Sequence, residues 1–157
     1  MAKENEKCCQ LIKREEWDEK ELVWRSKPFY RTKYKEFMHM PLNYGSVLRK
    51  ARAKISESGL STEAFALSGE ESVFSSSLLV PVSEKRAGLP IELVNGTFLT
   101  KVFEGNYSEI KSWIQEMTNY VHGKDKEAAK LWFWYPVCPK CAKEYKKIQT
   151  VIFAALK

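Results

Sequence analysis

Two stretches of the chain carry apolar side chains at helical spacing, with charged side chains on the opposite side. The first covers residues 44–57 and stops before Gly59, a residue type suited to the end of a helix. The second stops before Gly123 and places five apolar side chains on one face, namely Ile110, Trp113, Ile114, Met117 and Val121. The spacing predicts two amphipathic helices.

Six other stretches are rich in β-branched, aromatic and aliphatic residues, as strands are. They cover residues 29–40, 64–67, 76–82, 97–103, 131–135 and 149–156. A polar turn is expected at Ser68-Gly69-Glu70-Glu71, and Gly88-Leu89-Pro90 is expected to connect two halves. Each half then has the order strand, helix, strand, strand.

The two halves also match at the residue level. Asn43–Val47 corresponds to Asn106–Ile110, and Ala51 falls opposite Ile114 at the same offset of 63 residues. We therefore predict an α+β fold of duplicated β-α-β-β units, with a mixed or antiparallel sheet, two helices on one face and a ligand cleft between the repeats. The expected organisation is an N-terminal arm over residues 1–27 and a domain over 28–157, with repeats at about 28–84 and 91–157.

The amino-acid composition indicates a globular protein with a net positive charge. Hydrophobic residues make up 44% of the 157 residues and charged residues 29%, and the net charge is +6. The positive charges are scattered among acidic residues and accompany no groove-reading motif, so we expect no nucleic-acid partner. No apolar run approaches the roughly 20 residues that span a bilayer, and no signal peptide is recognisable. We expect a soluble, cytoplasmic protein with no membrane partner.

One stretch resembles a known family. The run Val102-Phe103-Glu104-Gly105-Asn106-Tyr107-Ser108-Glu109-Ile110, followed by a helix with Trp113, is similar to the turn of GyrI-like proteins, and Pro41-Leu42-Asn43-Tyr44-Gly45 resembles its counterpart in the first repeat. The resemblance covers about residues 28–156. It implies a SOUL-like, small-molecule-binding fold.

The resemblance also implies classes of function. Related domains form the effector-binding parts of drug-responsive transcription regulators and also occur as stand-alone drug-binding proteins. One enzyme branch hydrolyses cyclopropane-bearing, DNA-alkylating xenobiotics within an aromatic cage. Because no helix-turn-helix can be fitted before residue 28, the resemblance favours a stand-alone binder or enzyme.

The sequence departs from the pattern of members that bind cationic drugs. Such members are expected to place a carboxylate in the strand after the second helix, at a position that here falls at or near Trp132. An aromatic wall is therefore expected in place of a buried anion.

Strand alternation places Trp132 and Trp134 on one face and Leu131, Phe133 and Tyr135 on the other. Either tryptophan can be plain core or a stacking platform for a flat ligand. Tyr44 and Tyr107, each at a helix start, are the expected partners. The full predicted ligand-binding set is Phe37, Met38, Tyr44, Tyr107, Trp113, Trp132 and Trp134.

Hydrolysis needs a base for water, and Glu104 is the first candidate because it ends a strand just before the expected cleft. The alternative is a surface or capping carboxylate. Glu70 and Glu144 are weaker candidates, and neither His39 nor His122 belongs to a recognisable nucleophile and base arrangement.

Cys138-Pro139-Lys140-Cys141 is a CxxC motif between two expected strands. It can form a turn with no catalytic role, bind zinc, or cycle as a dithiol. A structural zinc site needs four ligands, and only the adjacent pair Cys8 and Cys9 remains. No other cofactor is expected.

Three hypotheses follow. The first is a protein that captures hydrophobic or aromatic small molecules and hydrolyses them as a detoxifying step. The second is a non-catalytic sensor or sequestering protein for the same molecules. The third is an interaction module stabilised by its cysteines and zinc.

Overall fold

The computed structural model describes residues 12–37, 40–41, 43–72, 74–136 and 148–157. Its helices are α1 (Arg14–Trp17), α2 (Tyr44–Glu57), the 3₁₀ helix η2 (Tyr107–Glu109) and α3 (Ile110–His122). Its strands are β1 (Lys20–Phe37), β2 (Met40–Pro41), β3 (Leu67–Glu70), β4 (Ser75–Pro81), β5 (Ile91–Gly105), β6 (Ala128–Trp134) and β7 (Ile148–Leu156). The two predicted helices are confirmed within one residue of their expected ends.

The strands form a closed, antiparallel barrel. Neighbouring strands follow the order β1-β4-β3-β6-β7-β5, and β5 pairs back with β1, so six strands complete the ring while β2 extends β1 at one edge. The strands do pair antiparallel, but the predicted sheet that carries both helices on one face is wrong, because the sheet closes on itself. The pairing that closes the ring joins residues about seventy positions apart, such as Trp24 with Gly96, and local patterns do not encode it.

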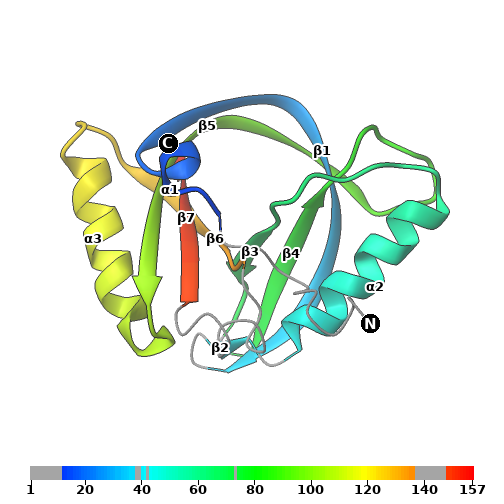
Figure 1. Ribbon diagram of the computed structural model, residues 1–157. Helices are drawn as coiled ribbons and strands as arrows, with labels where there is room; N and C mark the ends of the chain where they lie inside the picture. Colours follow the sequence, from blue (N-terminus) through cyan, green and yellow to red (C-terminus); the bar gives the residue numbers. More distant parts are fainter. Residues whose placement is uncertain (1–11, 38–39, 42, 73, 137–147) are drawn as a thin grey trace.

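Closure depends on two long strands that bend. β1 and β5 arch over the top of the barrel (Figure 1). The register of this pair shifts between Trp24 and Lys27, where Ser26 has a φ of 50° and its N–H donates to Asn95 Oδ1 at 2.8 Å. A bulge of this kind increases strand twist and lets a sheet curl.

The helices lie outside the barrel, on different sides of it. α2 packs against β1 and β4, whereas α3 packs against β5 and β7 (Figure 1). The predicted pair of helices on one face of an open sheet, with a ligand cleft between them, is accordingly wrong. Each helix does pack against strands from its own half of the chain, but the strands of both halves curl into one ring.

Several strand boundaries differ from those expected, and the differences at β1 and β3 bear on the predicted domain start and turn. β1 begins at Lys20 and runs through position 28, where the sequence analysis placed the start of the domain. β3 covers Leu67–Glu70, so Ser68 and Gly69 belong to a strand and not to the predicted turn.

No helix among the described residues is long and apolar enough to cross a membrane.

Candidate functional site

The sheet buries two separate sets of apolar side chains, one on each face. The set that includes every buried residue of α2 and α3 lies between the helices and the barrel, and we call it the outer layer. The other set contains no residue of these helices and fills the barrel; we call it the interior cluster. Its buried members are Phe29, Phe65, Leu67, Leu79, Phe98, Val102, Trp134, Val151 and Phe153, and its half-buried members include Ile12, Trp17, Leu22, Trp24, Val94, Trp132 and Ala155.

Aromatic rings dominate the interior cluster. Trp24 lies 4.5 Å from Phe98 and stacks on Phe65 at 5.8 Å and 18°. Phe65 in turn stacks on Phe153 at 5.9 Å and 19°. Such offset and edge-on pairs contribute beyond their buried area and leave ring faces suited to flat molecules. The barrel therefore offers an aromatic interior.

Strand β6 shows how the sequence places rings on both faces. Trp132 and Trp134 belong to the interior cluster, while Phe133, Tyr135 and Leu131 belong to the outer layer. The predicted alternation is confirmed. Only the structure shows which face of β6 points into the barrel, because alternation assigns residues to opposite faces without saying which face is inside.

Trp132 is held flat against the neighbouring strand. Gly69 lies opposite it on β3, and a Cβ at Gly69 would stand 2.6 Å from the Trp132 ring. The Lys130 ammonium lies 4.2 Å from the centre of the same ring. The ring is half-buried, so one part of it packs inside the barrel and another part is open to solvent.

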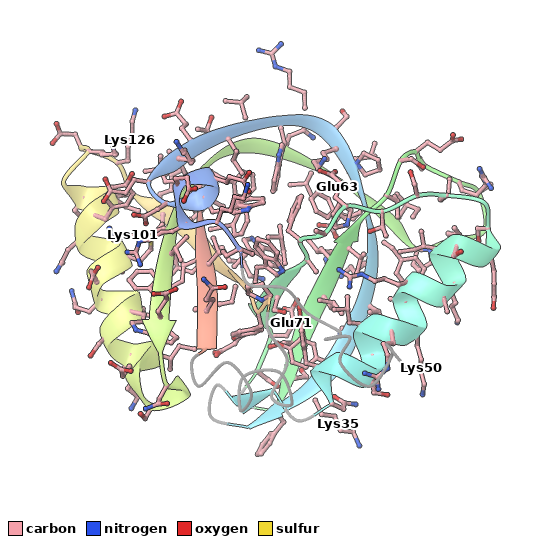
Figure 2. The ribbon with its side chains drawn as sticks, viewed as in Figure 1. Lys35, Lys50, Glu63, Glu71, Lys101 and Lys126 are labelled. Carbon is pink, nitrogen blue, oxygen red and sulfur yellow. The ribbon has the colours of Figure 1, made fainter. Side chains whose placement is uncertain are left out.

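A network of charged side chains centred on Arg31 lies where β3 and β4 meet, near Trp132. Arg31 donates to Glu92 and, at 3.1 and 3.0 Å, to Glu71 Oε1 and Ser77 Oγ. The Ser77 hydroxyl also donates to Glu71, and this hydrogen bond, with the charges of Lys130 and Arg31, lowers the pKa of Glu71 despite an opposing effect of burial. Figure 2 shows Glu71 near the ends of β3 and β4 and Glu63 near the arch of β1 and β5.

The predicted base, Glu104, stands on β5 with its partner Gln149 opposite on β7. Gln149 Nε2 donates to Glu104 Oε2 at 3.0 Å, and Gln149 itself is buried, with 2% of its surface exposed. Glu104 is exposed and lies two positions from Val102 on the same face of the strand. A carboxylate thus stands at the rim of the aromatic interior, oriented by an amide.

Two other predicted ligand residues, Tyr44 and Trp113, do not belong to this interior. Tyr44 is buried in the outer layer, edge-on to Tyr34 at 5.3 Å and to Tyr135 at 5.4 Å. Trp113 stacks on Phe103 at 5.9 Å in the same layer. The structure therefore groups Trp132 with Trp134 and separates both from Tyr44 and Trp113.

Several candidates fall outside what the structure describes. Met38, His39, Cys8, Cys9, Cys138, Cys141 and Glu144 lie outside the described residues, as do the side chains of Phe37 and Tyr107. Within the described ranges, no cluster of three or more His, Cys, Asp or Glu side chains could hold a metal ion. The zinc alternative at Cys138 and Cys141 stays a prediction.

Six aromatic members of the interior lie outside the predicted ligand-binding set, namely Trp17, Trp24, Phe29, Phe65, Phe98 and Phe153. Trp17 was assigned to an N-terminal arm and Trp24 was not assigned to a strand. The alternation of Leu22 and Trp24, both interior, was the available signal. Polar neighbours such as Glu21, Arg25 and Ser26 concealed it.

Comparison with known proteins finds one matching sequence family and several solved structures of similar fold. A sequence model of a family described as bacterial hydrolase matches residues 1–156. Among curated proteins, none matches the sequence. The fold is of the effector-binding, GyrI-like kind.

Three solved structures share the fold. A hydrolase from Listeria innocua has a TM-score of 0.63 at 12% identity, with 94% of each chain covered. The C-terminal domain of EcmrR has a TM-score of 0.62 at 12% identity, covering 88% of this chain and 94% of that one. EcmrR in a complex with DNA has a TM-score of 0.65 at 10% identity. At such identities the likeness shows the fold alone.

The prediction that excluded nucleic acid from the partners is wrong, because a protein solved in complex with DNA shares this fold. The match covers 88% of this chain and 56% of that EcmrR chain, so the chain spans little more than half of its length. The fold is therefore compatible with a place in a DNA-associated protein.

Proposed function

The chain belongs to the bacterial hydrolase family, and from that premise we propose that it takes up a flat, hydrophobic aromatic molecule in the barrel interior and hydrolyses it. The observation that carries the proposal is the interior cluster, in which half-buried Trp132 adjoins buried Trp134 and Phe153. Ring faces in such a setting contribute roughly 0.5 to 2 kcal/mol per contact to the binding of flat or cationic ligands.

Glu104 is the group we propose to activate water. Its carboxylate accepts a hydrogen bond from buried Gln149, which holds one oxygen in place, and the residue is exposed. Water bound there gives its proton to the carboxylate as its oxygen attacks an electrophilic carbon of the ligand. In a cyclopropane-bearing electrophile, the new C–O bond forms as a ring C–C bond breaks, and the displaced electron pair takes up a proton at the conjugated end.

The binding step is tested by tryptophan fluorescence and calorimetry with a panel of planar aromatic compounds. Because Trp132 is a half-buried tryptophan of the interior cluster, Trp132→Ala is expected to weaken binding about 3- to 30-fold. Trp113→Phe is the matched control, since Trp113 lies in the outer layer, and its affinity is expected to stay unchanged. Equal weakening by both variants would contradict an interior site.

The hydrolytic step is tested by product mass with the cyclopropane-bearing members of that panel. We expect a product heavier by one water from the native chain, and a loss of turnover of about 100-fold or more in Glu104→Gln with binding kept. Glu57→Gln serves as control, because Glu57 is an exposed glutamate at the end of α2, outside the barrel. Binding with unchanged ligand mass in the native chain would instead identify a sequestering or sensing protein.

A further inference from the structure

The segment before β1, residues 12–18, is tied to the barrel at three points. Gln149 Oε1 accepts the N–H of Ile12 at 2.9 Å, and Gln149 Nε2 donates back to Ile12 O at 3.4 Å. Thr100 Oγ1 donates to Trp17 O. Val102 N donates to Asp18 Oδ1 at 2.9 Å. The segment therefore crosses from β7 to β5 along the rim of the interior.

The same segment inserts one ring into the interior cluster. Trp17 lies edge-on to Trp134, with ring centres 4.9 Å apart, and also contacts Phe65 at 5.6 Å and Phe153 at 5.7 Å. Trp134 and Phe153 are the rings that adjoin Trp132. The indole of Trp17 thus occupies part of the space to which the ligand was assigned above.

Little besides Trp17 anchors this segment by apolar contact. α1 has four residues and none is buried, and Glu15 and Glu16 are exposed. A helix this short is not stable by itself, so its position depends on the insertion of Trp17, the packing of Ile12 and the three polar ties. Such a segment can leave the barrel without disturbing a strand.

We infer that Trp17 is a built-in competitor for the ligand site, and that residues 12–18 form a strap which must lift before an aromatic molecule enters. The inference rests on the proposed binding of aromatic molecules in the interior. When the open state is only a small fraction of the molecules, the apparent affinity falls by that fraction. Removing Trp17 removes this penalty, and the site accepts larger ligands.

The experiment uses the full chain and anilinonaphthalene sulfonate, an environment-sensitive aromatic dye. Trp17→Ala is expected to bind the dye at least about tenfold more tightly than the native chain. Glu16→Ala, an exposed position in the same short helix, is the matched control and is expected to bind like the native chain. Unchanged or weaker affinity in Trp17→Ala would overturn the inference.

A second variant guards against a simple packing defect. Thr100→Val removes the hydroxyl that donates to Trp17 O. It keeps the side-chain shape opposite Phe153, the ring that faces Thr100 across the β5–β7 pair. If Trp17 competes with the dye, loosening Trp17 in this way is expected to raise the affinity of Thr100→Val for the dye about threefold or more. A purely structural tryptophan would leave the affinity of Thr100→Val the same or lower.

Hydrogen exchange of the native chain completes the test. Saturating dye is expected to speed exchange of the amides of residues 12–18 and to slow exchange in β6 and β7; slower exchange in both regions would overturn the strap. If the native chain and Trp17→Ala bind the dye equally, the proposed strap is contradicted and the proposed aromatic site is supported. If neither binds, both proposals fall.

Discussion

At the scale of single residues, Gly69 decides where the Trp132 ring can lie. The ring occupies the place that a side chain at Gly69 would need, with Trp132 Cζ3 2.6 Å and Lys130 Cε 2.9 Å from a Cβ built there. Real Cβ atoms do not approach other atoms so closely. The absence of a side chain at position 69 therefore sets the shape of the interior next to the ring.

The Gly69→Ala variant is expected to push Trp132 from β3 and to destabilise the protein by about 1 to 3 kcal/mol, the usual cost of overpacking. Urea unfolding measures the stability, and the emission maximum of the tryptophans reports the ring's new surroundings. Gly88→Ala is a useful comparison, because that glycine has open space around its Cβ position but a φ of 87°. It should lose stability through backbone strain without a shift of emission.

At the scale of elements, Arg31 links strands that are distant in sequence. It joins β1 to Ser77 on β4, to Glu71 in the turn after β3, and to Glu92 on β5. Solvent screens part of this network, because the side chains of Arg31, Glu71 and Glu92 are between 33% and 41% exposed. Its hydrogen bonds, more than its net charge, are expected to hold the β3–β4 turn against β1.

The Ser77→Ala variant tests this turn through its dependence on pH. The pKa of Glu71 lies below its ordinary value of 4.5, chiefly because of the Ser77 hydroxyl. A lowered pKa contributes stability that is present above pH 4.5 and disappears as the pH falls through the pKa of the folded state. The difference in unfolding free energy between native chain and variant is therefore expected to be largest near pH 7 and to shrink as the pH falls through the pKa of Glu71 in the folded state.

A neighbouring serine is the natural control for that measurement. Ser75 hydrogen-bonds Ser72 within the same turn, at 3.1 Å between the hydroxyl oxygens. Ser75→Ala is expected to change stability by the same amount throughout this pH range. A Ser77→Ala difference that is equally independent of pH would show that Glu71 does not contribute through its ionised form.

At the scale of the whole molecule, the barrel is closed by seams of unequal strength. β5 and β7 pair over eight positions, from Phe98 with Ala155 to Gly105 with Ile148. In the described part of the chain, β3 and β6 pair at one position, Ser68 with Phe133. The ring is expected to open first between β3 and β6, beside Trp132.

Native-state hydrogen exchange measures this difference directly. Amides of residues 98–100, where β5 lies between β1 and β7, are expected to exchange only by global unfolding. Amides of β3 and β6 that face each other are expected to exchange about tenfold faster or more, by local opening. Equal protection at both places would contradict a weak seam.

The sequence by itself determined the local elements of this protein. Periods of 3.6 and 2 residues were enough to locate α2, α3 and the alternation of Trp132 with Phe133, because such patterns depend on neighbours a few positions away. They also supported the order strand, helix, strand, strand in each half.

Only the tertiary structure decided that the sheet closes into a barrel, which face of each strand turns inward and where the candidate aromatic site lies. Trp24 meets Gly96 because β1 and β5 pair across about seventy residues. Trp17 meets Trp134 because residues 12–18 are tied to β5 at the rim of the closed ring. No local pattern states which of two alternating faces will turn inward when a sheet curls. That choice follows from the pairing of the whole ring, and it moved the candidate site from a cleft between helices to the inside of the barrel.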